Sequence, residues 1–284
     1  MLQLAHVDDA KLYFGRDLAA PELAEIASGT AAVFSSRAPG SARANEDSAA
    51  LIPLGPESAL LVVADGVGGA PAGEQAARVA IEAVWSHLAE ASGLALPSPG
   101  MILESIEAAQ HSVRGLGVGA ATTLAALEVR GSRVRPYHVG DSRVLVIGQR
   151  GRVKLQTVSH SPVGFAVEAG VLDERDAMHH ADLHLVSNVL GAEDTRIEVG
   201  SSLRLARFDT ALLGSDGLFD NLFVHEVVEL LRRGALAQAM QGLVSAAQQR
   251  MAAAGGPEPC KPDDLTLVAF RPGPPRQRPR TPTE

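Results

Sequence analysis

The 284-residue chain has a single cysteine, Cys260, and few aromatic residues, which make up 4% of the sequence. One cysteine excludes a disulfide framework within the chain and favours a reducing compartment. The scarcity of aromatic side chains argues against stacking platforms for single-stranded nucleic acid. The formal net charge of −8 argues against nucleic-acid binding more generally, because a surface that binds nucleic acid is basic.

Long hydrophobic runs are also missing from the sequence. No uninterrupted apolar stretch approaches the roughly 18 residues that span a membrane. The first residues lack the basic and apolar segments of a signal peptide. We therefore expect a cytoplasmic protein that binds neither membrane nor nucleic acid. Apolar residues still make up 46% of the chain, which is enough for a sizeable core.

The order of the hydrophobic patterns predicts a mixed α and β structure. Helices are predicted over 73–88, after Pro99 and within 224–251, where Gly234 interrupts the pattern. Because helices and strands do not alternate regularly, we expect antiparallel sheets covered by helices rather than a parallel α/β fold. The predicted strands cover residues 30–34, 48–52, 59–64, 122–129, 134–139, 143–147, 153–158, 202–206, 209–214 and 265–270.

Acidic residues stand at the ends of several predicted strands. The apolar run 61–64 ends at Asp65, and the run 212–213 is followed by Asp216. Carboxylates at strand ends can converge in a folded sheet even when they are far apart in sequence. Their oxygen atoms suit a hard divalent ion such as Mg²⁺ or Mn²⁺. Each acid alone is more typical of a turn or a solvated surface, so the prediction depends on their joint occurrence.

The pattern of ligands favours these ions over zinc. The chain has no HExxH motif and no cysteine pairs. Two ions that share a bridging carboxylate can lower the pKa of a bound water and hold a phosphoryl group for attack. Asp65 and Gly66 offer a carboxylate and a backbone carbonyl within one turn.

As a set, these motifs resemble the metal-dependent PP2C-type (PPM) protein serine/threonine phosphatases, especially the bacterial ones. The resemblance covers roughly residues 30–270. It implies an α+β fold, a four-layer α-β-β-α sandwich of two antiparallel sheets flanked by helices. The motifs that carry it are Asn45-Glu46-Asp47-Ser48, Asp65-Gly66-Val67-Gly68-Gly69 with Gly73-Glu74, Thr122-Thr123, Val139-Gly140-Asp141-Ser142-Arg143, Ser215-Asp216-Gly217-Leu218 and Asp263-Asp264-Leu265-Thr266.

The resemblance also implies an activity and a cofactor. The family hydrolyses phosphoserine and phosphothreonine in proteins with a metal-activated water, using two Mn²⁺ or Mg²⁺ ions. The implied partners are phosphorylated proteins, in opposition to a Ser/Thr kinase. By position in the motifs, Asp65 would bridge the ions and Gly66 would offer its carbonyl. Asp47, supported by Glu46, would hold one of the ions.

Asp216 and Asp263 match the ligands of the other ion. Asp141 matches the residue that, together with Asp216, can hold a weaker third ion. Residues 160–195 correspond to the variable flap of the family, which shapes access of the substrate. We expect residues 1–29 to form an N-terminal extension, residues 30–271 the phosphatase domain, and residues 272–284 a disordered tail.

The phosphate-binding arginine is one of three departures from the family pattern. It usually lies four residues before the glutamate, where this chain has Ala42. Arg43 is therefore the candidate phosphate ligand, since a planar guanidinium suits a phosphate group. Arg37 is the weaker alternative.

The other two departures from the family pattern are Val67 and Asp264. Val67 stands where some members have a histidine proposed as general acid, so the leaving oxygen takes its proton from water or from an unidentified group. Asp264 replaces the usual asparagine and can either compete with Asp263 for the metal or add negative charge that tightens metal binding. Two other functions stay open: a non-catalytic module that binds phosphoproteins, and a hydrolase of small phosphate esters.

Overall fold

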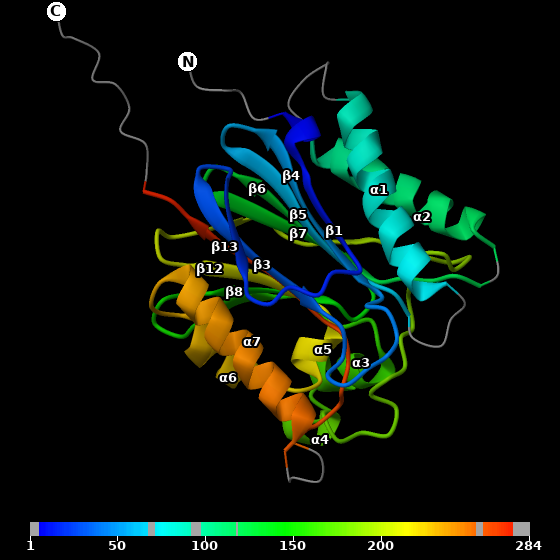
Figure 1. The fold of residues 1–284 in the computed structure, drawn as a ribbon, viewed down its shortest axis with the longest axis vertical. Coiled ribbons are helices and arrows are strands. Elements are labelled where there is room, and N and C mark those ends of the chain that lie inside the picture. The colour runs from blue at the N-terminus through cyan, green and yellow to red at the C-terminus, as the bar shows by residue number, and fades with distance from the viewer. Residues whose placement is uncertain (1–5, 68–71, 92–97, 118, 254–257, 275–284) are drawn as a thin grey trace, which may run out of the picture.

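The computed structural model describes residues 6–67, 72–91, 98–117, 119–253 and 258–274. Two antiparallel sheets pack face to face, and a pair of helices covers the outer face of each (Figure 1). This is the predicted α-β-β-α sandwich. The glycines Gly68 and Gly69 of the predicted metal turn lie outside the described residues.

The first sheet has the strand order β1 (Lys11–Phe14), β4 (Asp47–Gly55), β5 (Ser58–Asp65), β6 (Leu124–Arg130), β7 (Arg133–Val139) and β10 (Glu198–Val199), and β11 (Leu203–Arg204) also pairs with β7. The second sheet has the order β2 (Glu22–Ile26), β3 (Gly29–Ser36), β13 (Leu265–Pro272), β12 (Thr210–Gly214), β8 (Arg143–Ile147) and β9 (Val153–Gln156). Every strand predicted from the sequence overlaps one of these.

Helices α1 (Gly73–Ala91) and α2 (Pro99–Gly115) cover the first sheet, and α6 (Val224–Leu231) and α7 (Leu236–Ala252) cover the second (Figure 1). The hydroxyl of Ser98 accepts a hydrogen bond from the Met101 N–H and caps α2, with Pro99 in the first turn. Shorter helical segments are η1 (Val7–Asp9), α3 (Pro162–Glu168), α4 (Glu174–Ala177) and α5 (Asp216–Phe219).

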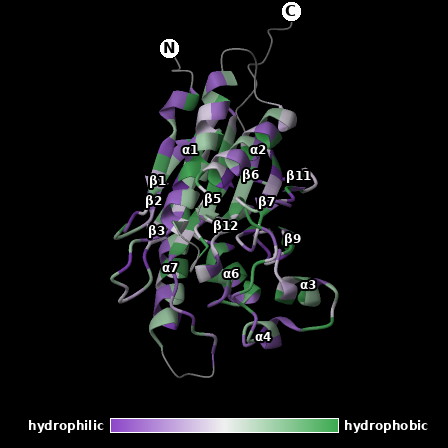
Figure 2. Ribbon diagram, turned by 90° about the vertical axis from the view of Figure 1, so that its right-hand side faces the viewer, coloured by the Kyte–Doolittle hydropathy of each residue, from purple (hydrophilic) through white to green (hydrophobic). Residues whose placement is uncertain are grey.

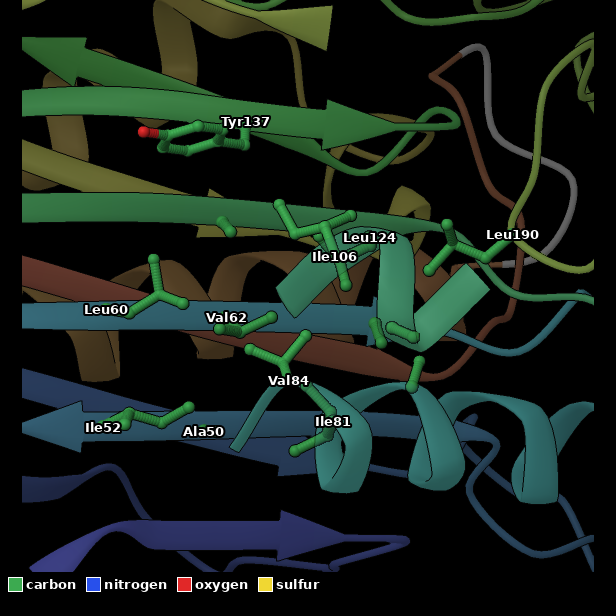
Figure 3. Close-up of a cluster of buried hydrophobic side chains, with 14 of the residues drawn as sticks. Ala50, Ile52, Leu60, Val62, Ile81, Val84, Ile106, Leu124, Tyr137 and Leu190 are labelled. Carbon is green, nitrogen blue, oxygen red and sulfur yellow. The ribbon is translucent and has the colours of Figure 1, made fainter. Parts of the chain in front are cut away.

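Strand β5 shows why the chain forms a four-layer structure. Leu60 and Val62 pack toward α1 and α2, whereas Leu61 and Val63 pack between the two sheets. Figure 3 shows Leu60 and Val62 beside the helix residues Ile81 and Val84. Successive side chains of a strand point to opposite faces, so a strand that is apolar on both faces needs cover on both sides.

The hydropathy of the residues follows the same layers. The central strands are largely hydrophobic, and helices such as α1 and α7 carry both hydrophobic and hydrophilic residues (Figure 2). Among the described residues, none of the helices combines the length and the apolar character that crossing a bilayer requires.

The segment that the sequence analysis treated as an N-terminal extension contributes edge strands to both sheets. Strand β1 pairs with β4, and β2 pairs with β3. These strands are short and carry exposed charged residues, so they lack the apolar runs that identify the inner strands. At the other end, β13 continues to Pro272, and residues 275–284 of the expected tail lie outside the described residues.

Replacing Ile81 with alanine should destabilise the protein by about 2–5 kcal/mol, because the side chain is fully buried between α1 and the first sheet and its removal leaves a cavity. Chemical denaturation measures the change. Ser86→Ala, at an exposed position of the same helix, is the control and should change stability by less than about 0.5 kcal/mol. Equal losses in the two variants would contradict the assigned packing.

Candidate metal centre

Two acidic residues face each other at the end of neighbouring strands. In the antiparallel pair β4 and β5, Asp47 lies directly opposite Asp65. Both continue the alternation of residues that pack between the sheets, so their side chains lie on the same face of the first sheet. Asp47 is 1% exposed and Asp65 is partly buried. Like charges directly opposite each other on a sheet are destabilising, so this pair requires a compensating charge.

Hydrogen bonds hold the backbone of Asp65 in this place. Its carbonyl oxygen accepts from the Thr122 hydroxyl at 2.7 Å and from the Thr123 N–H at 2.8 Å. The Gly66 N–H donates to the Glu46 carbonyl at 3.2 Å, and a Cβ at Gly66 would lie 2.4 Å from the backbone of Gly73. The turn after Asp65 therefore needs glycine for close packing.

The second sheet brings three more acids to the same region. Asp216 follows β12 and Asp263 precedes β13, and these two strands are antiparallel neighbours. Asp141 lies just before β8, whose first residue Arg143 pairs with Gly214 at the end of β12. Each of the five acids therefore sits at a strand end, on adjacent strands of one sheet or the other.

The electrostatics of this cluster favour a cation. Desolvation and the charge of Asp47 raise the pKa of Asp65 well above its ordinary value, and desolvation and Asp264 do the same for Asp47. Burial and the charge of Asp216 raise the pKa of Asp141 to about 7 and that of Asp263 to about 6. Among the described residues, the buried Oδ2 atom of Asp47 has no hydrogen-bond partner. These carboxylates fit a divalent metal ion.

Glu46 and the two candidate arginines lie on the loop that leads into β4. Burial raises the pKa of Glu46, and the nearby Arg43 partly opposes this shift. The side chain of Arg43 is exposed at the rim of the acidic cluster. Arg37 instead forms an ion pair with Asp17, with Nε and Oδ2 separated by 2.6 Å. Of the two, Arg43 is the one whose charge acts on Glu46, whereas the guanidinium of Arg37 is already paired with Asp17.

Asp264 has a structural role that the sequence analysis did not foresee. Its two carboxylate oxygens accept the backbone N–H groups of Ala38 and Glu46, each at 2.7 Å. These bonds tie both ends of the loop 38–46 to the start of β13. A carboxylate that accepts two N–H groups is a stronger acceptor here than the amide oxygen of an asparagine would be.

A histidine cluster fixes the flap. The Nδ1 atom of His160 accepts from the Gly140 N–H at 3.1 Å and from the Asn188 amide at 2.8 Å. With Nδ1 accepting, the proton is assigned to Nε2, which faces Glu198 at 3.2 Å. His138 stacks on His160 with ring centroids 4.3 Å apart. His160 thereby joins both ends of the flap to the turn before Asp141.

Ligating atoms of His138, His160 and Glu198 lie within 4.8 Å of one another and form a second group that could hold a metal ion. The Nε2 atom of His138 already lies 2.9 Å from the Val158 carbonyl, and both nitrogens of His160 are hydrogen-bonded. These three ring nitrogens therefore already have hydrogen-bond partners within the protein.

A cavity of about 390 Å³ lies between the flap and the second sheet. Flap residues such as Val163 and Met178 form one wall, and Phe219 and Arg143 form the other. The guanidinium of Arg143 lies 5.0 Å from the ring centroid of Phe219, a cation–π contact. The flap is thus supported over a partly apolar space rather than packed flat on the sheet.

Lys261 is a site residue that the sequence analysis missed. Its Nζ lies 2.6 Å from Asp216, 2.8 Å from Asp220 and 3.2 Å from Asp263. Burial lowers the pKa of Lys261, but attraction by these three carboxylates outweighs it and raises the pKa above its ordinary value. One signal was present in the sequence: the chain has only three lysines among its 25 basic residues, and one of them stands two residues before Asp263.

The fold is shared with solved phosphatase structures. The PPM Ser-Thr phosphatase of Mycobacterium smegmatis, solved with cacodylate, is 25% identical and superimposes with a TM-score of 0.70 over 86% of this chain and 98% of its own. The catalytic domain of the serine/threonine protein phosphatase PstP, solved with two manganese ions, is 26% identical with a TM-score of 0.66, over 85% of this chain and 96% of its own.

Sequence comparison leads to the same class. Residues 40–254 match the family model of protein phosphatase 2C. The chain therefore belongs to the protein phosphatase 2C family.

Two curated relatives show the range of lengths in this group. The serine/threonine phosphatase stp of Listeria innocua is 28% identical over 203 residues, which are 66% of this chain and 77% of the relative. The serine/threonine protein phosphatase PstP of Mycobacterium tuberculosis is 31% identical over 215 residues, which are 74% of this chain but only 39% of that longer protein.

The raised pKa of Asp65 predicts a pH-dependent cost in the metal-free protein. The folded state holds this proton above pH 3.8, the ordinary pKa, while the unfolded state releases it. Stability therefore falls as pH rises through this window. In chelator, Asp65→Asn should be more stable than the wild type at pH 8, and the advantage should shrink toward pH 4. Denaturation at a series of pH values measures it, and a pH-independent difference would contradict the shift.

Proposed function

We propose that this protein phosphatase hydrolyses phosphoserine and phosphothreonine in proteins with a metal-activated water. The observation that carries the proposal is the placement of Asp47 opposite Asp65, with both pKa values raised by desolvation and by neighbouring acids. Acids that repel one another at the edge of a core make sense as ligands of divalent cations. The curated relatives with similar sequences are named serine/threonine phosphatases.

The residues divide into two groups around a shared ligand. Asp65 would bridge two Mn²⁺ or Mg²⁺ ions. The Gly66 carbonyl, Asp47 and Glu46 would serve one ion, while Asp216 and Asp263 would serve the other. When bound, such ions supply a water of lowered pKa and positive charge for a phosphoryl group.

Asp141 and Asp216 together would hold a third, weaker ion. The β7–β8 turn that carries Asp141 is fixed by the hydrogen bond from Gly140 to His160. The domain that performs this chemistry would span residues 30–271, and the preceding strands β1 and β2 would add one edge strand to each of its two sheets.

The chain itself binds and orients the substrate. Arg43 is exposed at the rim beside Glu46, where its planar guanidinium can pair with two phosphate oxygens. Asp264 fixes the loop that carries Arg43 through two backbone hydrogen bonds. Because position 67 is valine, the leaving oxygen would take its proton from water or from another group of the site. The flap, which His160 anchors, would shape access for phosphoproteins made by a Ser/Thr kinase.

A phosphothreonine peptide tests the activity. The purified protein should release phosphate from it only with added Mn²⁺, and more efficiently than from a small ester such as p-nitrophenyl phosphate. Asp216→Ala should lower kcat/KM by about a thousandfold or more, because metal-based charge stabilisation amounts to several kcal/mol. The same variant should keep its circular dichroism spectrum. A folded protein without turnover at millimolar Mn²⁺ would favour a non-catalytic phosphoprotein-binding module instead.

Arg43→Ala should raise KM for the peptide by about tenfold and change kcat less, because a charge-assisted hydrogen bond to substrate contributes about 1.5–3 kcal/mol. Arg37→Ala is the matched control on the same loop. Its guanidinium is already paired with Asp17, so KM should stay near that of the wild type. Steady-state kinetics measure both, and a larger effect of Arg37→Ala would reassign the phosphate ligand.

A further inference from the structure

The ammonium of Lys261 stands among the carboxylates that the proposed function assigns to a metal ion. It contacts the Oδ2 atoms of Asp216 and Asp263, both proposed ligands, and of Asp220, which is not one. A metal ion and an ammonium that bind the same carboxylate oxygens compete for them. The two positive charges also repel each other, and the low dielectric of a partly buried site strengthens that repulsion.

Lys261 is held in this position by more than its ion pairs. The buried side-chain amide of Asn221 donates to the Lys261 carbonyl at 2.8 Å and accepts from the Lys261 N–H at 2.9 Å. Asn221 also donates to the Gly217 carbonyl within α5. The backbone of Lys261 is therefore clamped to the helix that carries Asp216, and its side chain has a short, defined reach.

Asp220 is an ion-pair partner of the Lys261 ammonium outside the proposed ligand set. Asp216 and Asp220 are four residues apart, so they lie on the same side of the α5 turn. The Asp220 side chain is only 5% exposed. A buried carboxylate next to Asp216 would be costly without a partner, and Lys261 supplies that partner whether or not Asp216 is occupied by a metal.

We propose that Lys261 is an internal competitor for the metal ion at Asp216 and Asp263, and that its ammonium withdraws onto Asp220 when the ion binds. This inference rests on the proposed function. In the metal-free protein, Lys261 neutralises the acids of the second sheet and stabilises the fold. In the metal-bound protein, its remaining charge weakens the hold on that ion.

The choice of lysine fits this role. The chain uses arginine for nearly all of its basic positions and has lysine only at Lys11, Lys154 and Lys261. An ammonium is a compact point charge on a flexible stem, whereas guanidinium is a wide planar fork. An ammonium therefore suits a position that a single metal ion can take between Asp216 and Asp263, because its flexible stem lets it move to Asp220.

Calorimetric titration of the chelator-treated protein with Mn²⁺ tests the competition. Lys261→Met keeps the length of the side chain and removes its charge. It should tighten one class of Mn²⁺ sites by at least about tenfold, equal to about 1.4 kcal/mol. The same variant should melt at a lower temperature than the wild type in chelator, and at an equal or higher temperature with saturating Mn²⁺. Lys154→Met removes the ion pair with Asp209 and should leave Mn²⁺ affinity unchanged.

The outcomes separate this inference from the proposed function. Mn²⁺ binding of equal affinity in wild type and Lys261→Met would overturn the competition and leave the metal site standing. An absence of Mn²⁺ binding in both folded proteins would overturn the metal site and the competition together.

A second measurement needs no mutation. Brief acetylation with and without Mg²⁺, followed by mass spectrometry, compares the three lysines in one sample. If metal displaces the ammonium from Asp216 and Asp263, the reactivity of Lys261 should rise severalfold relative to Lys11 and Lys154. A ratio that Mg²⁺ does not change, in protein that binds Mg²⁺ by calorimetry, would overturn the proposal.

Discussion

The repulsion among carboxylates at one end of the sandwich is the constraint on which the rest of the structure depends. Asp47 and Asp65 lie opposite each other on neighbouring strands, and burial together with neighbouring acids raises the pKa of both. Such a cluster survives only where the surrounding fold is stable enough to hold it. Three apolar clusters, one between the sheets and one beneath each helix pair, supply that stability away from the acids.

Hydrogen bonds then fix the positions of the residues around the acidic cluster. The hydroxyl of Thr122 and the N–H of Thr123 hold the Asp65 carbonyl, and Asp264 holds both ends of the loop that carries Arg43. His160 joins the flap to the turn before Asp141. These groups bind mainly to backbone atoms, and they fix where the acids and the arginine lie. A site fixed in this way loses little entropy when it binds a ligand.

The site contains side chains of both charges. Five carboxylates attract cations, and Lys261 offers one cation from within the chain. If the ammonium and a metal ion bind Asp216 and Asp263 in turn, the ammonium reduces the repulsion between these carboxylates in the metal-free protein. The strength of metal binding is then set by a residue outside the ligand set, which the general pattern of the family motifs does not report.

The sequence by itself predicted the inner strands and acidic metal ligands at their ends, and the resemblance of its motifs to a known family implied the four layers. Apolar runs with tight turns marked the inner strands, and Asp-Gly pairs at strand ends marked Asp65 and Asp216, because both signals are local in the chain. Only the tertiary structure decided what pairs across the chain: β1 and β2 as edge strands, Asp264 as a loop clamp, Arg37 bound to Asp17, and Lys261 among three acids. These depend on which strands become neighbours, and residues more than 200 positions apart, such as Ala38 and Asp264, meet only once both sheets are packed.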